Sequence, residues 1–262
     1  MDARRVKTVV RRHVYVLRRS PHRFFDVTVW PLLDVLLFGS LGAYVAQQDG
    51  SSKAGAPYLL AGILMFHILY QLQIAICTGF MEETWSRNVL NILTTPVTEA
   101  EYILGVALFG LAKLLLAMAA LTVMAVAFFG FNLTSVGWGL LPITAVLLLA
   151  GWSIGMAVIG LMLRYGQSAE ILAWGINFLV MALSGVFNPV DAIPSALQPL
   201  SRILPTTHAF SALRTLLDGQ PLPWGEIGAG LIGAVICAAI SIWYSARMLR
   251  TFRRRGYVTR FS

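Results

Sequence analysis

A cluster of polar side chains interrupts two long apolar runs of the chain between Met81 and Pro96. It contains an acidic pair, an arginine and two asparagines, groups that lipid-buried chain carries only for a reason. The chemistry open to these groups is ion pairing and hydrogen bonding. The pattern predicts a short surface helix from about Glu83 to Thr94, ended by Pro96. Such a helix between two spans could receive a push from a soluble partner, and a helix that merely connects the spans fits the same pattern.

The remaining reactive groups show no arrangement that predicts an enzyme. The sequence contains no Gly-Lys dipeptide, so the phosphate-binding loop that ends in Gly-Lys-Ser or Gly-Lys-Thr is absent. If ATP drives the protein, a separate subunit must bind the ATP and its Mg²⁺. The four histidines show no metal-ligand spacing with one another or with the two cysteines. We therefore expect no catalytic residue, cofactor or metal in this chain.

A few polar side chains fall inside the apolar runs. Asp34 and Lys113 would lie at similar depths in their spans, so they are a candidate intramembrane pair. Lys113 could equally extend its ammonium group to the membrane surface. His67 and Gln71 share one helix face, where hydrogen bonding between helices fits better than lining a pathway.

The composition predicts a helical membrane protein with several spans. Of the 262 residues, 57% are hydrophobic and only 12% are charged, against about 25% charged in soluble domains. The net charge of +8 comes largely from the two ends of the chain, since eight of the 20 Lys and Arg lie in residues 1–23 and six in 247–260. This placement is typical of cytoplasmic flanks and of contact with anionic lipids, not of nucleic-acid binding. Both termini are therefore expected in the cytoplasm, which requires an even number of spans.

The periodicity divides the chain into one membrane domain, 1–262. Residues 1–20 carry apolar positions three and four apart beside a basic face, which predicts an amphipathic interfacial helix. A capping box from Thr98 to Glu101 predicts the start of the third span, and Gly151 and Gly155 form a GxxxG pattern for close helix packing. The six expected spans cover about 26–46, 57–80, 101–130, 137–163, 168–188 and 225–247, followed by a cytoplasmic tail at 248–262.

Four prolines punctuate an apolar segment ahead of the last span. Their spacing excludes another crossing helix, while the apolar residues between them argue against a solvated loop. We expect residues 189–214 to form short re-entrant helices on the outer side. Asp191 could cap the first of these helices, and Thr206 or Thr207 the next.

Two blocks of this sequence resemble the ABC-2 family of export permeases. One is Glu82-Glu83-Thr84-Trp85-Ser86-Arg87-Asn88-Val89-Leu90-Asn91-Ile92-Leu93-Thr94-Thr95-Pro96, which continues to Gly105. The other is Ser184-Gly185-Val186-Phe187-Asn188-Pro189-Val190-Asp191-Ala192-Ile193-Pro194, with Leu204-Pro205-Thr206-Thr207-His208, Leu213-Arg214 and Asp218-Gly219 after it. The chain departs from the family at Trp85-Ser86-Arg87-Asn88, where many members carry a small turn with glycine.

The resemblance implies an all-α permease of a bacterial-type inner membrane that pairs with a second permease copy and two cytoplasmic ATPase subunits. Residues 82–94 would then be the coupling helix, which contacts the ATPase through Glu82, Glu83, Trp85, Arg87, Asn88, Leu90 and Leu93. The outer gate would include Phe187, Asn188, Pro189, Asp191, Pro194, Pro205, His208 and Arg214. The cargo would be an amphipathic lipid, a glycolipid or polysaccharide precursor, or a hydrophobic compound. A channel or scaffold that works without ATP is the alternative.

Overall fold

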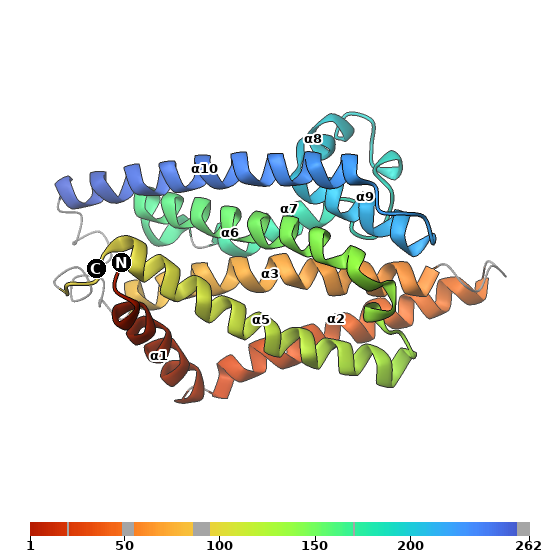
Figure 1. Ribbon diagram of the computed structural model, residues 1–262, viewed down its shortest axis with the longest axis horizontal. Coiled ribbons are helices and arrows are strands. Elements are labelled where there is room, and N and C mark those ends of the chain that lie inside the picture. The colour runs from red at the N-terminus through yellow and green to blue at the C-terminus, as the bar shows by residue number, and fades with distance from the viewer. Residues whose placement is uncertain (20, 49–54, 86–94, 170, 256–262) are drawn as a thin grey trace.

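The described part of the chain is built from helices packed side by side along one long axis (Figure 1). The computed structural model describes residues 1–19, 21–48, 55–85, 95–169 and 171–255. The α-helices are α1 (Ala3–Arg19), α2 (Pro21–Gln48), α3 (Gly55–Trp85), α5 (Glu99–Phe129), α6 (Leu140–Tyr165), α7 (Ile171–Leu183), α8 (Gln198–Ile203), α9 (Pro205–Leu217) and α10 (Trp224–Arg255). Short 3₁₀-helices cover η1 (Leu133–Gly139), η2 (Gly166–Ala169) and η3 (Val190–Ala192).

Four helical stretches within the described ranges are long and apolar enough to cross a membrane, namely Pro57–Thr84, Glu101–Phe129, Leu133–Tyr165 and Trp224–Thr251. α2 holds a shorter apolar stretch, Val29–Val45. α7 has 13 residues, about 20 Å of helix against a hydrocarbon core of about 30 Å. The span expected at 168–188 is therefore shorter than its apolar sequence suggested, because the chain leaves helical geometry after Leu183 and turns at Gly185 with φ of +68°.

The central helix of the bundle is α3. In its most apolar stretch 89% of the residues are buried, and it is contacted by α2, α5, α6, α7 and α9. A helix that is apolar on every side can be covered by lipid or by other helices, and the burial of α3 shows that other helices cover it. Leu64, Leu69 and Leu72 are among its fully buried side chains. Because α3 is enclosed, it positions the elements on either side of it.

Glycine allows α6 to approach α3 closely, as the GxxxG pattern predicts. A Cβ atom at Gly151 would lie 2.7 Å from the carbonyl oxygen of Leu69, and one at Gly155 would lie 3.1 Å from the Cβ of Ile76. Gly151 to Gly155 also has the Gly-x-Ser-x-Gly spacing of a hydrolase nucleophile, which requires a turn between a strand and a helix. Ser153 instead lies inside α6 and donates its hydroxyl to the carbonyl of Leu149 at 2.6 Å. The motif therefore packs helices.

We expect Gly151→Ala to destabilise the bundle by about 1–3 kcal/mol, because the added methyl group overlaps the backbone of α3. Thermal unfolding of the purified protein in detergent measures the effect. Gly175→Ala on α7 is the matched control, since a Cβ there meets nothing within 4 Å. The control should be neutral or slightly stabilising. Equal melting temperatures for the two variants would contradict the close packing of α6 on α3.

Different helices lie at the two ends of the bundle. α1, the end of α3, the start of α5 and the end of α10 lie together at the left of Figure 1. The segment from η3 to α9 lies at the opposite end, beside the start of α10. This arrangement separates the interruption at 81–96 from the proline-rich segment by the length of α3.

Candidate functional site: α1 across the ends of α3 and α5

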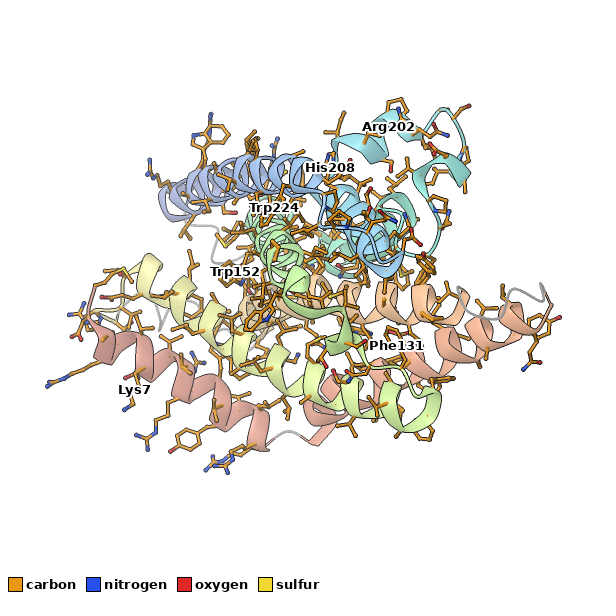
Figure 2. All side chains as sticks on the ribbon, turned by 45° about the vertical axis from the view of Figure 1, so that its right-hand side comes forward. Lys7, Phe131, Trp152, Arg202, His208 and Trp224 are labelled. Atoms are coloured by element: carbon orange, nitrogen blue, oxygen red, sulfur yellow. The ribbon has the colours of Figure 1, made fainter. Side chains whose placement is uncertain are left out.

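The helix expected in residues 1–20 is present as α1, and its apolar side packs on α5. Val6, Val9 and His13 are buried, while Lys7 and Arg11 between them are exposed, and Lys7 points away from the bundle in Figure 2. A Cβ atom at Gly105 of α5 would lie 2.6 Å from the Cγ1 of Val9, so the two helices touch closely there. The His13 ring stacks on Phe109, with ring centroids 5.3 Å apart. α1 is thus fixed on the bundle by one narrow face.

Arg12 binds the end of α3 through two contacts. Its guanidinium lies 2.6 Å from Oε1 of Glu83 and donates to Oε2 at 2.8 Å. Glu83 is 3% exposed, whereas the side chain of Arg12 is 43% exposed. Two parallel contacts between a guanidinium and a carboxylate fix direction as well as distance. This pair therefore sets how α1 is oriented against the last turn of α3.

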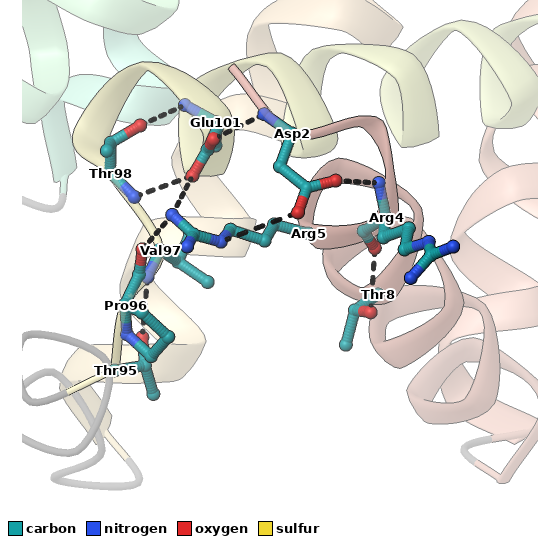
Figure 3. A network of polar contacts seen from close by, with 9 residues as sticks. All are labelled: Asp2, Arg4, Arg5, Thr8, Thr95, Pro96, Val97, Thr98 and Glu101. Atoms are coloured by element: carbon teal, nitrogen blue, oxygen red, sulfur yellow. Dashed lines mark hydrogen bonds and ion pairs between the residues drawn. The ribbon is translucent and has the colours of Figure 1, made fainter.

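Glu101 binds the other end of α1 to the start of α5 (Figure 3). Its carboxylate accepts from the backbone N–H of Asp2 at 2.7 Å and from that of Thr98 at 2.9 Å. Glu101 N donates to the Thr98 hydroxyl at 3.3 Å, which completes the predicted capping box. Arg5 lies 3.6 Å from Glu101 and donates to the carbonyl of Pro96 at 2.6 Å. One buried carboxylate thus joins the N-terminus of α1, the cap of α5 and the residues before it.

The name α1 cluster is used below for these two junctions, Arg12–Glu83 and Asp2–Arg5–Glu101. They stand at either side of residues 86–94, so one helix holds both ends of the interruption. Glu82, Glu83 and Trp85 lie in the last turns of α3, which corrects the expected helix break after residue 80. Arg87, Asn88, Leu90 and Leu93 lie outside the described residues.

The sequence interpretation missed the α1 cluster, although one signal was present. Arg12 stands three residues after Val9 and directly before His13, so it borders the buried stripe of α1 instead of the free basic face. An arginine at the edge of an apolar stripe is placed to bind a carboxylate on the helix beneath.

Asp34, which the sequence predicts to pair with Lys113, contacts a histidine in the structure. Asp34 of α2 contacts His67 of α3, with Oδ2 and Nε2 3.1 Å apart. His67 is 2% exposed and its ring meets Tyr70 edge-on. Similar depth did not determine which side chains face each other, because rotation about each helix axis also matters. His67 therefore joins two helices, the role preferred for it from sequence.

A second polar contact inside the bundle joins α3 to α7. Gln73 is fully buried and donates to the carbonyl of Ala173 at 2.9 Å, while Asn177 donates to Oε1 of Gln73 at 2.6 Å. Hydrogen bonds between buried side-chain amides are a typical way of joining membrane helices. This contact positions the short helix α7 directly against α3.

The proline-rich segment is held together by Arg214 of α9. Its guanidinium donates to the carbonyl of Gly185 and, at 2.7 Å, to that of Asn188, and burial lowers its pKa. Phe187 stacks on Phe38 of α2 with centroids 4.2 Å apart, and His208 lies 2.6 Å from Glu226 of α10. Arg214, Phe187 and His208 therefore anchor the segment to its neighbours. Asn188, Pro189, Asp191 and Pro194 are exposed, and Pro205 is buried.

The capping residues expected in this segment were wrong. Pro189 precedes η3 and Leu204 precedes α9, both without a side-chain cap. Thr206 contacts the Ser184 hydroxyl at 2.5 Å, and Thr207 donates to the carbonyl of Ser201 at 2.6 Å. Pro205 starts α9 without needing a capped N–H, so the threonines are free to join α9 to α7 and α8.

Comparison with known proteins agrees with this architecture. The sequence model of the family described as ABC-2 type transporter matches residues 4–217. Nodulation protein J of Rhizobium meliloti (strain 1021) is 30% identical over 222 residues, which cover 82% of this chain and 82% of that protein. Inner membrane transport permease YadH of Escherichia coli (strain K12) is 23% identical over 202 residues, 74% of this chain and 77% of that protein. The chain belongs to the ABC-2 type transporter family and is the membrane component of a transporter.

Proposed function

We propose that this protein is the inner-membrane permease of an ATP-driven exporter, powered by two separate ATPase subunits and paired with a second copy of itself. The observation that carries the proposal is the α1 cluster. Buried carboxylates stand on both sides of residues 86–94, and arginines of α1 bind both. A surface segment that merely connected two spans would not need both of its ends fixed. A segment that receives force from a partner needs both ends fixed, because a loosely held segment would move without moving the spans.

α3 is suited to carry such a movement across the bundle. It continues without a break for 31 residues, about 46 Å, from the α1 cluster to the far end. At that end, any side chain at Gly62 would collide with the carbonyl oxygen of Val186, and Tyr58 donates to Asp218. A tilt or shift of α3 driven at Glu83 would therefore displace the segment held by Arg214. We assign this segment the role of outer gate.

The proposed cargo is an amphipathic lipid, a glycolipid or polysaccharide precursor, or a hydrophobic compound. The predicted outer connections of the chain are short, so they offer no folded receptor for a soluble ligand. A similar protein is named an inner membrane transport permease, which supports both the location and the activity proposed.

Affinity purification of the full-length permease from its native cells, followed by native mass spectrometry, tests the proposal. The expected spectrum contains two permeases, two ATPase subunits and a bound lipid-like molecule. Replacing Glu82, Glu83 and Arg87 together with alanine should leave the permease folded while the ATPase is lost or its hydrolysis no longer drives transport. Full transport by this triple variant would exclude the coupling role. A permease that is fully active without any ATPase would favour the ATP-independent channel instead.

A further inference from the structure

The ends of α6 and α10 enclose a basic hollow that the transport mechanism above does not use. Its volume is about 470 Å³, and its lining combines arginine, aromatic and hydroxyl side chains from both helices. The lining residues are Arg164, Trp243, Tyr244, Arg247, Met248 and Thr251. The helix ends that line it, those of α6 and α10, lie at the same end of the bundle as α1 (Figure 1).

The hollow forms where two tightly packed helices stop touching. At Gly160 an added Cβ would collide with the Tyr244 ring, and Ser245 donates its hydroxyl to the carbonyl of Met156 at 2.5 Å. One turn beyond these contacts, Arg164 lies in the last turn of α6, while α10 continues to Arg255. The hollow is therefore fixed by a rigid contact directly beneath it.

The two arginines of the hollow have no carboxylate partner among the residues that the structure describes. Arg164 lies over the Tyr165 ring at 5.1 Å, and Arg247 lies over the Trp243 ring at 5.5 Å. A cation near the end of a helix offsets the helix dipole, which accounts for Arg164 alone. Arg247 lies two turns before the end of α10, so the dipole does not explain it. Aromatic rings beside cations are typical of the headgroup layer of a membrane.

We propose that Arg164 and Arg247 bind the phosphate of an anionic phospholipid in the cytoplasmic leaflet. Guanidinium groups from two helices present several N–H donors to one phosphate, and the exposed ring of Trp243 beside the half-buried Tyr244 is apolar surface for the glycerol and upper acyl chain. The inference needs only that this end of the bundle faces the cytoplasm, not that the protein exports anything. A lipid bound here would join α6 to α10 at the membrane surface.

Native mass spectrometry of the full-length permease, loaded with phosphatidylglycerol or with phosphatidylcholine of the same chain length, tests this site. Wild type should retain phosphatidylglycerol in preference to phosphatidylcholine. Arg164→Gln with Arg247→Gln should weaken retention of phosphatidylglycerol by about tenfold or more. Arg18→Gln with Arg19→Gln is the matched control, since it removes two exposed charges from the same end of the molecule. The control should change retention less than about twofold.

Other outcomes overturn the proposal. Equal losses in the two double variants would mean general attraction by charge instead of a site. Displacement of the lipid by excess inorganic phosphate would assign the arginines to a soluble anion. If the double variant keeps its lipid but loses a copurifying protein, the hollow is a protein-docking surface. Arg164→Lys with Arg247→Lys keeps both charges and should recover part of the preference for phosphatidylglycerol over phosphatidylcholine.

Discussion

Arg12→Glu is expected to uncouple the permease from the proposed ATPase and to lower its own stability. The substitution places a second carboxylate against Glu83, which is buried and bound to Arg12 at 2.6 and 2.8 Å. An unpaired buried charge is costly, and because Arg12 is 43% exposed, water relieves part of the cost. We expect a loss of about 2–3 kcal/mol. In a protein of this size that lowers the melting temperature by about 4–10 °C.

The decisive measurement compares three variants in nanodiscs for ATPase recovery and for ATP hydrolysis. Arg12→Glu should recover at most about one fifth of the ATPase, as expected for a loss of at least 1 kcal/mol at the junction. Arg12→Glu with Glu83→Arg reverses the pair and should restore most of it. Arg11→Glu is the control, since Arg11 is exposed and contacts Tyr15 within α1. If Arg11→Glu is as damaging as Arg12→Glu, the net charge of α1 matters and the junction with Glu83 does not.

Features that depend on neighbouring residues were predictable from the sequence. The apolar face of α1, the capping box at Thr98 and the close packing at Gly151 each follow from spacings of three or four residues. The helical membrane class follows from composition and run length, and the family follows from two local blocks. All of these signals come from residues close together in the sequence, so a single sequence is enough to recognise them.

Features that depend on how helices face each other were not predictable. Asp34 binds His67, and Glu83 binds Arg12, a residue 71 positions away. To predict either pair, one must know how each of the two helices is rotated about its own axis, and the depth of a residue in the membrane does not determine that rotation. The end of α3 was also misplaced, because an acidic pair after an apolar run predicts the end of a helix unless a cation is known to lie above it. Arg12 supplies that cation, so the helix continues through Glu83.

Arg214→Gln, in the proline-rich segment, is expected to have the second large effect. The arginine holds the carbonyls of Gly185 and Asn188 on the turn that follows α7, and a glutamine reaches at most one of them. Hydrogen bonds from a charged donor are worth about 1.5–3 kcal/mol each, so we expect a loss of about 2–4 kcal/mol. The turn should loosen without unfolding the bundle, because Gln73 and Asn177 still hold α7 to α3.

Hydrogen exchange of residues 184–192 measures this loosening directly, and ATP-dependent export measures its consequence. Arg214→Gln should speed exchange in the turn by at least about tenfold and should abolish export while ATP hydrolysis continues. Arg202→Gln is the matched control from the same segment. Arg202 is largely exposed, and its ion pair with the exposed Asp191 is long at 3.5 Å and therefore weak. The control should leave exchange and export unchanged. Fast exchange in the turn with normal export would show that this segment is not the gate. Slow exchange in Arg214→Gln would mean that the turn is held by Phe187 on Phe38 and by Ser184 on Thr206, so that the arginine contributes little to it.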